Sequence, residues 1–180
     1  MKAISLWQPW ASLIACSAKP YETRSWAPPS DYIGQRIAIH AAKKIDKGAA
    51  QFAQEILYGQ HKQGGFDLAD TVAATFNRTP EELLGRFGMS MMPIGAVVCT
   101  AVLEAAFQLG PPKNATTART VRRLTSKPEH YSLDVQYDDW GDYSEGRWAW
   151  LLSGVQVINP APAVKGAQGF FELPAGWAGS

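Results

Sequence analysis

The sequence has few of the residues that build metal sites and disulfides. Its two cysteines, Cys16 and Cys99, form no CxxC pair and no metal-ligand spacing, so we expect buried free thiols, as in a reducing compartment. The three histidines, His40, His61 and His130, are scattered along the chain. This inventory argues against a zinc site. We expect neither a metal nor a cofactor.

The chain also lacks a charge excess and a long apolar run. With 17 Lys and Arg against 16 Asp and Glu, it has no strongly basic coat, so nucleic-acid contact must come from a local patch or from base recognition. The first apolar run is broken by Gln8 and Pro9, which predicts no signal peptide. No stretch reaches the roughly 18 apolar residues of a spanning helix. We expect a cytoplasmic protein, monomeric and without a membrane partner.

What is present suits one globular domain dominated by strands. The alternation in Arg36–Ala41 and the β-branched run Pro93–Ala106 predict strands, the second of them central. Lys2–Leu6 reads as a short strand, and Trp10–Ser17 as a helix that follows a proline. Turn signals between the strands favour an α+β fold with a small mixed or antiparallel barrel.

Two long segments stand apart from this pattern. Residues 46–88 are helical in character, and Thr79 followed by Glu82 predicts a helix N-terminus there. Leu109–Tyr137 is polar and predicts a surface excursion or mobile loop.

The densest chemical signal is AKPYETRSW (Ala18–Trp26). Lys19, Glu22 and Arg24 lie close together there, beside Tyr21 and Trp26. Aromatic rings next to opposite charges suit a flat, polar ligand such as a nucleobase. In a functional site, Arg24 would keep Glu22 ionised and partial burial would lower the pKa of Lys19, so that the pair activates water and stabilises an oxyanion. Alternatively, Glu22 and Arg24 form a structural salt bridge.

Further candidates flank this segment in the sequence. Trp7 and Trp10 recur at helical spacing, which suits either a core face or a stacking surface. Between them, the amide of Gln8 has the donor and acceptor needed to read a base edge. In GDYSEGRWAW, Asp142, Tyr143 and Arg147 form a polar turn that suits either ligand contacts or a simple capped turn.

The remaining candidates are basic or histidine side chains. His40 ends a predicted strand and suits either a structural or a ligand-binding role. Lys43, shortly after it, would make a phosphate contact. Arg119, Arg122 and Arg123 form either a solvated face or a track for a nucleic-acid backbone, in which case binding weakens with salt.

These blocks together resemble the ASCH domain family of the PUA-like superfamily, in its stand-alone bacterial and phage form. The blocks are LWQPWASLI, AKPYETRSW as a version of the family's G-x-K-x-x-E-x-R segment, RIAIHA, PIGAVV, GDYSEGRWAWLL and KGAQGFFELP. Their order and spacing make the resemblance specific. It covers most of a single domain over residues 1–180, with insertions at about 43–92 and 109–137.

The resemblance implies a small PUA-like barrel with flanking helices, a helical insertion and a ligand cleft around the K-x-x-E-x-R segment. The implied partner is RNA or a modified nucleoside. Some small members are amidohydrolases that remove the acyl group of N4-acetylcytidine, and their lysine falls on Lys19. Their threonine falls on Glu22, with Thr23 one position off, and their downstream glutamate finds a counterpart only in Asp142 or Glu145.

The expected activity is therefore hydrolysis of the amide of N4-acylated cytosine nucleosides. The catalytic set would be Lys19, Glu22 and Arg24. The substrate-binding residues would be Trp7, Gln8, Trp10, Tyr21, Trp26, His40, Asp142, Tyr143 and Arg147. A non-catalytic RNA-binding module is one alternative. A metal-independent ribonuclease is another, in which Lys19, Tyr21 or His40 would assist attack by a ribose 2′-hydroxyl.

Overall fold

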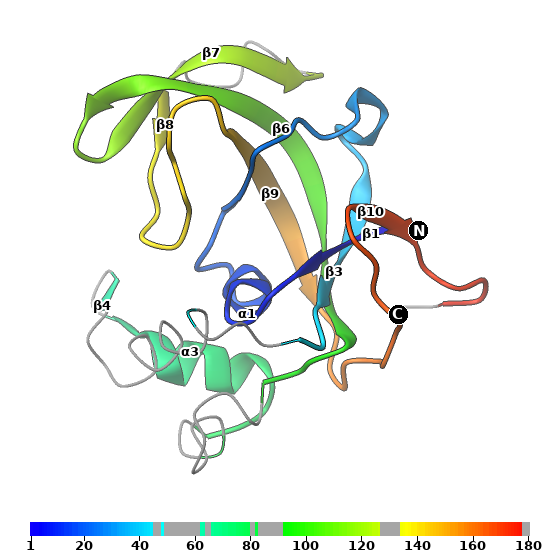
Figure 1. The fold of residues 1–180 in the computed structure, drawn as a ribbon. Coiled ribbons are helices and arrows are strands. Elements are labelled where there is room, and N and C mark those ends of the chain that lie inside the picture. Colours follow the sequence, from blue (N-terminus) through cyan, green and yellow to red (C-terminus); the bar gives the residue numbers. More distant parts are fainter. Residues whose placement is uncertain are drawn as a thin grey trace. The chain divides into compact units, whose positions relative to one another are not determined.

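The structure is a computed structural model that describes residues 1–44, 48, 62–63, 66–79, 82, 92–126 and 134–177. These residues are mostly in strands, with few helices (Figure 1). In chain order the elements are β1 (Lys2–Leu6), α1 (Trp10–Ala15), β2 (Tyr21–Arg24), the 3-10 helix η1 (Ser30–Tyr32), β3 (Arg36–Ala41), β4 (Lys62–Gln63), β5 (Phe66–Asp67), α3 (Leu68–Thr75), β6 (Ala96–Asn114), β7 (Thr117–Thr125), β8 (Asp134–Gln136), β9 (Trp148–Val157) and β10 (Phe170–Glu172).

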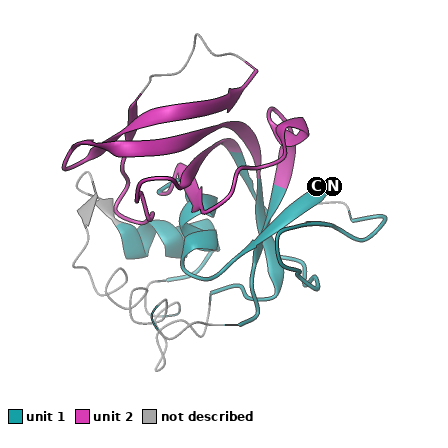
Figure 2. Cartoon of the chain, turned by 45° about the horizontal axis from the view of Figure 1, so that its top comes forward, with its two compact units in different colours: residues 1–18, 38–100, 155–180 teal, residues 19–37, 101–154 magenta. Residues whose placement is uncertain are grey.

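The chain divides into two compact units, coloured in Figure 2. The first comprises Met1–Ala18, Ala38–Thr100 and Val155–Ser180. The second comprises Lys19–Ile37 and Ala101–Gly154. Each is described separately below.

The predicted mixed sheet is confirmed. Neighbouring strands pair in the order β10-β1-β3-β6-β7-β8, and β9 pairs with β6 and β2. The ladder of β1 with β3 is parallel, whereas β1 with β10 and β6 with β7 are antiparallel. Within the described strands this order is open, because β8 pairs with β7 and β10 with β1, and nothing joins the two ends into the predicted closed barrel.

The first unit has a core of small and aliphatic side chains. Ala3 of β1 lies opposite Ala38 of β3, and both pack with Val97 and Leu173. Helix α1 buries Leu13 and Ile14 along with the alanines on either side of them. It ends at Ala15, two residues before the predicted boundary, because Ser17 adopts a positive φ of 62°, a backbone conformation that terminates helices.

The predicted helical insertion is described only in part. Helix α3 buries Leu68, Ala69, Val72 and Ala73, the spacing of an amphipathic helix face. Further along, Thr79 forms the predicted cap, and the structure shows that the cap is reciprocal with Glu82. The Glu82 side chain accepts from the Thr79 backbone N–H at 2.9 Å, and the Thr79 hydroxyl accepts from the Glu82 N–H at 3.3 Å. The rest of residues 43–92 lies largely outside the described residues.

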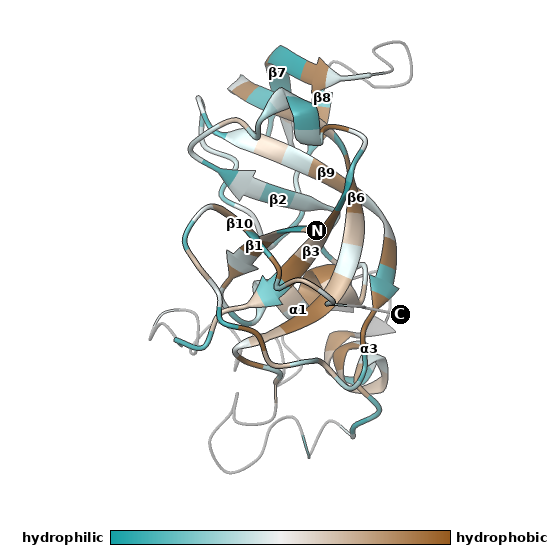
Figure 3. Cartoon of the chain, turned by 90° about the vertical axis from the view of Figure 1, so that its right-hand side faces the viewer, coloured by the Kyte–Doolittle hydropathy of each residue, from teal (hydrophilic) through white to brown (hydrophobic). Residues whose placement is uncertain are grey.

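The second unit is built on a hairpin where the sequence predicted a loop. Strand β6 continues to Asn114, and β7 returns beside it as far as Thr125. The connecting turn is held by the Asn114 side chain, which accepts from the Thr116 N–H at 2.9 Å. Of the two alternatives for Leu109–Tyr137, the mobile loop was wrong where the segment is described, residues 109–126 and 134–137, because the polar residues of β7 occupy exposed positions of a strand. Figure 3 shows the contrast between brown, apolar β6 and the teal patches of β7.

The core of the second unit is aromatic and aliphatic. Ala105, Phe107 and Leu109 of β6 pack with Ala118, Val135, Tyr143 and Ala149. Strand β2 lies antiparallel to β9, with Tyr21 opposite Leu151 and Glu22 opposite Trp150. Because side chains alternate along a strand, Tyr21 joins this core while Glu22 belongs to the other face.

Candidate functional site

The predicted charge cluster forms within the second unit. Glu22 and Arg24 lie two residues apart on β2, so they share one face of the strand, and Arg24 Nε lies 2.8 Å from Glu22 Oε1. The Glu22 side chain is 10% exposed and that of Arg24 26%. The predicted salt bridge therefore exists and is mostly shielded from water, a setting in which a charged hydrogen bond orients a carboxylate well.

Lys19 is the most unusual side chain of the cluster. Its side chain is only 1% exposed, and its Nζ lies 3.7 Å from Oδ1 of Asp138. That separation is an ion-pair distance but too long for a good hydrogen bond. Among the residues that the structure describes, Nζ has no hydrogen-bond partner. A buried amine with unused donors is costly unless something else satisfies it, so this position indicates a ligand or water site.

Asp138 is a site residue that the sequence prediction missed. Its side chain is 4% exposed, and Oδ1 accepts a 2.9 Å hydrogen bond from the Trp140 N–H. In the described part of the chain, Oδ2 has no hydrogen-bond partner. The sequence signal was the pair Asp138-Asp139 before Trp140, of which Asp138 is buried and Asp139 exposed.

Burial shifts the pKa values of Lys19 and Glu22 in opposite directions. Burial lowers the pKa of Lys19, and the negative charges of Glu22 and Asp138 oppose that shift. Burial also raises the pKa of Glu22, against the positive charges of Arg24 and Lys19. Burial therefore moves both pKa values toward neutrality, while the opposite charges within the cluster favour the ammonium and carboxylate forms.

Tyrosine rings border the Lys19–Asp138 pair. Tyr21 and Tyr143 meet edge to face at 6.5 Å, and Tyr137 stacks on Tyr143 at 4.7 Å. Burial and then the negative charge of Asp138 raise the pKa values of Tyr21 and Tyr143. Both phenols stay protonated at neutral pH and keep a hydroxyl donor near the carboxylate.

Trp26 follows β2 and provides an exposed aromatic surface. Its ring meets that of Trp150 edge to face at 4.8 Å. Trp26 is 36% exposed, whereas Trp150 is fully buried in register with Glu22. An indole fixed in this way and open to solvent is suited to stacking on a planar base.

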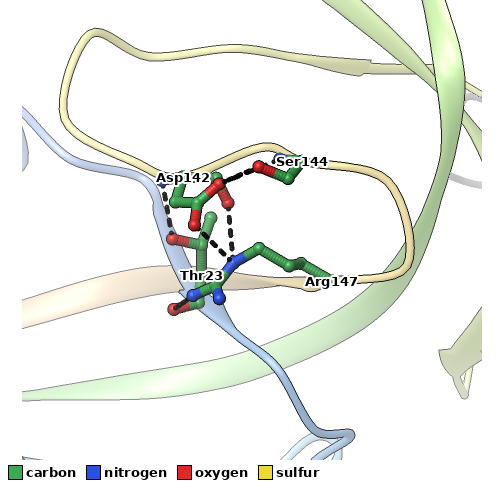
Figure 4. A network of polar contacts seen from close by, with 4 residues as sticks. All are labelled: Thr23, Asp142, Ser144 and Arg147. Atoms are coloured by element: carbon green, nitrogen blue, oxygen red, sulfur yellow. Dashed lines mark hydrogen bonds and ion pairs between the residues drawn. The ribbon is translucent and has the colours of Figure 1, made fainter.

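Asp142 and Arg147 form a network that fastens the loop after β8 to strand β2 (Figure 4). Arg147 Nε lies 3.3 Å from Asp142 Oδ2, and its Nη2 donates to the Thr23 carbonyl at 3.3 Å. The Asp142 N–H donates to the Thr23 hydroxyl at 3.1 Å, and Asp142 also accepts from the backbone N–H and hydroxyl of Ser144. We call these four residues the loop latch. It anchors the loop that carries Asp138.

The three predicted backbone-binding arginines lie on β7. Arg119 and Arg122 are exposed, and Arg123 is half-buried. The Arg122 guanidinium lies 5.8 Å from the ring centroid of Trp148, a cation–π distance. We call the exposed Arg119 and Arg122 the basic strip of β7; Arg123 follows Arg122 directly, so its side chain points to the other face of the strand.

The candidates near the N-terminus belong to the first unit. Trp7 is 44% exposed, and Trp10 is half-buried. Gln8 is buried, and its amide is engaged at both ends: Nε2 donates to the Pro93 carbonyl at 2.7 Å and Oε1 accepts from the Ser12 N–H at 3.1 Å. Reading a base edge would require Gln8 to exchange one of these bonds.

His40, also in the first unit, is buried between two partners. Since the Val164 carbonyl can only accept, Nε2 donates to it at 3.0 Å, and Nδ1 accepts from the Ser5 hydroxyl at 3.0 Å. Burial lowers the pKa of His40, which favours this neutral form. Gly166 packs so closely that an added Cβ would lie 2.3 Å from the ring. Lys43 is exposed.

Two negative findings concern the described residues alone. No group of three or more His, Cys, Asp or Glu side chains comes together there in a way that would hold a metal ion. None of the helices in the same residues is long and apolar enough to cross a membrane.

Comparison with known proteins agrees with the resemblance. The family model of the ASCH domain matches residues 4–132, well over half of the chain, so the chain belongs to the ASCH domain family. The match includes Lys19, Glu22 and Arg24 but ends before Asp138 and before Asp142, Ser144 and Arg147 of the loop latch. No curated protein matches the sequence.

Proposed function

We propose that this protein binds modified nucleosides and hydrolyses the amide of N4-acylated cytosine. The observation that carries the proposal is the Lys19 amine, which is buried, lies near a carboxylate and has no hydrogen-bond partner in the described part of the chain. Membership of the ASCH domain family supports a ligand related to RNA. The opposite pKa shifts of Lys19 and Glu22 support a reaction that moves protons.

In the proposed reaction, Glu22 takes a proton from the attacking water while the water oxygen bonds to the acyl carbon. Arg24, at 2.8 Å from Glu22, holds that carboxylate in place. Lys19 in its ammonium form stabilises the oxyanion and then gives a proton to N4 as the carbon–nitrogen bond breaks. The products are a carboxylic acid and cytidine. The proton on Glu22 then passes to solvent, and Lys19 takes a proton back.

Aromatic side chains of the second unit would hold the base. Trp26 is the strongest candidate because its indole is exposed and braced against Trp150. Tyr21 is half-buried in the aromatic core, so its role would be to fix the position of Lys19 and Asp138.

The test is to incubate the protein with N4-acetylcytidine and follow cytidine release. Lys19→Met should lower kcat/KM by about 10²- to 10⁴-fold, the usual contribution of a positioned acid or base. Lys113→Met is the matched control, because Lys113 also pairs with an aspartate but at the surface. Absence of turnover by the wild type, or equal activity in both variants, would refute hydrolysis.

A second candidate function is RNA binding without chemistry, which the basic strip of β7 supports. The exposed Arg119 and Arg122, and the contact of Arg122 with Trp148, would track a phosphate backbone. Replacing Arg119, Arg122 and Arg123 with glutamine should then flatten the salt dependence of RNA binding. An unchanged slope rejects this role. Cleavage of RNA that 2′-deoxy substitution abolishes would instead indicate the ribonuclease alternative.

A further inference from the structure

Asp138 has an oxygen that nothing in the described structure uses. Oδ1 is occupied, since it accepts from the Trp140 N–H and lies nearest to Lys19. Oδ2 is buried and has no hydrogen-bond partner among the residues that the structure describes. A buried carboxylate oxygen left unsatisfied is unfavourable, so the position favours a molecule that brings a donor.

Lys19, the neighbour of Asp138, is a potential hydrogen-bond donor where Asp138 is a potential acceptor. Its Nζ, 3.7 Å from Oδ1, is a buried donor for which the described residues provide no hydrogen-bond acceptor. The pair therefore offers one donor and one acceptor side by side, away from water. The ligand that satisfies both presents an acceptor next to an N–H, which is the pattern at the edge of an acylated aminopyrimidine.

We propose that Asp138 is a substrate-binding residue whose Oδ2 accepts a hydrogen bond from the N4–H of an N4-acylated cytosine. An acceptor atom of the same ligand would meet Lys19 Nζ. This inference rests on the proposed function, because that function supplies the ligand. It adds a specificity determinant that lies outside the segment matched by the family model.

Three other ionisable side chains lie near the Lys19–Asp138 pair, and each has interactions of its own. Glu22 is bound by Arg24 on β2. Tyr21 and Tyr143 hold their protons, because burial and the charge of Asp138 raise their pKa values. The Tyr143 hydroxyl is close enough to Asp138 for that charge to raise the tyrosine pKa, but among the described residues neither this hydroxyl nor Asp138 Oδ2 has a hydrogen-bond partner.

The experiment compares binding of N4-acetylcytidine with binding of its N4-methyl derivative, which has no N4–H. Wild-type protein should prefer N4-acetylcytidine by about ten- to a hundredfold, the range for a hydrogen bond to a charged group. Asp138→Asn should reduce the preference to less than threefold. Asp139→Asn is the matched control, since Asp139 is adjacent but exposed, and it should keep the full preference.

A second measurement uses the wild type alone, so it does not depend on how a variant folds. Because the Lys19 side chain is only 1% exposed, its response is read by NMR: N4-acetylcytidine should shift the Lys19 side-chain resonances and leave those of Lys113 unchanged. The N4-methyl derivative should shift the Lys19 resonances less. Equal shifts with both ligands, or an unchanged preference in Asp138→Asn, would overturn the role of Asp138.

Failure of this inference can be distinguished from failure of the hydrolase. Selective binding that depends on Asp138 without cytidine release supports this inference and refutes hydrolysis. Cytidine release together with an N4–H preference that Asp138→Asn leaves unchanged supports hydrolysis and refutes this inference. No binding of either ligand overturns both.

Discussion

Two lysine–aspartate pairs in the second unit join the same chemical groups in opposite surroundings. Lys19 and Asp138 lie 3.7 Å apart with side chains 1% and 4% exposed. Lys113 and Asp134 lie 2.5 Å apart with side chains 50% and 28% exposed. The exposed pair lies within hydrogen-bond distance. The buried pair is farther apart, and among the described residues Lys19 Nζ and Asp138 Oδ2 have no hydrogen-bond partner.

The difference teaches what burial does to an ion pair. At the surface, attraction is screened and a pair contributes about 0–1 kcal/mol. In the interior, desolvation of each charge costs several kcal/mol, and hydrogen bonds must offset it. The Lys19–Asp138 pair lacks part of that compensation, as expected of a site that a ligand completes and not of one optimised for stability.

The largest expected effect comes from breaking each pair by removing its carboxylate. Asp138→Ala should lower the free energy of unfolding by about 3 kcal/mol, because it leaves a buried ammonium with less compensation. Asp134→Ala should lower it by less than about 1 kcal/mol. Urea titrations of the two variants measure both values, and similar losses would mean that burial does not distinguish the pairs.

The second largest effect should be on the pH dependence of stability, to which Lys19 should contribute and Lys113 should not. Because burial lowers the pKa of folded Lys19 below its ordinary value of 10.5, the unfolded chain binds more protons between the two pKa values. The contribution of Lys19 to stability therefore rises with pH through that window and is complete above 10.5. Lys19→Met should remove this slope.

The measurement is urea unfolding at a series of alkaline pH values. Lys113→Met serves as the control and should leave the slope as in the wild type. A wild type whose stability does not change across the window, or a slope that survives in Lys19→Met, would show that the Lys19 amine titrates normally.

The loop latch offers a way to disturb the buried pair from a distance. Arg147→Ala removes the ion pair with Asp142 and the bond to the Thr23 carbonyl. Because the network is partly exposed, we expect a stability loss of about 1 kcal/mol. Looser support of Asp138 should raise KM for N4-acetylcytidine several-fold more than it lowers kcat. Arg119→Ala, an exposed arginine outside the latch, should change neither parameter.

Salt should produce the smallest effect. At 1 M ionic strength the Debye length falls to about 3 Å, so the Lys113–Asp134 contribution should disappear. In a double-mutant cycle, the coupling energy of that pair should fall by a few tenths of a kcal/mol. The Lys19–Asp138 coupling should stay constant, since its side chains are shielded from the solution, and an equal loss in both cycles would contradict the comparison.

Much of the fold could be predicted from local patterns. The alternation of Arg36–Ala41 and the apolar run of β6 gave strands that the structure confirms, and the Thr79–Glu82 spacing gave a cap that forms. The hairpin of β6 and β7 could not be predicted, because its polar residues are explained only by the exposure of β7. The open sheet could not be predicted either, because closure into a barrel depends on pairing between strands far apart in the sequence, which no local pattern reveals.

The sequence by itself determined the ASCH family, the K-x-x-E-x-R segment and the Glu22–Arg24 ion pair, since two residues on one strand share a face. The tertiary structure alone decided that Asp138, more than a hundred positions after Lys19, becomes its partner. It also decided that Asp138 is buried and Asp139 exposed, although the two are adjacent and chemically identical. The physical reason is that burial depends on long-range packing, and burial determines whether a charge is solvated by water or needs another polar partner.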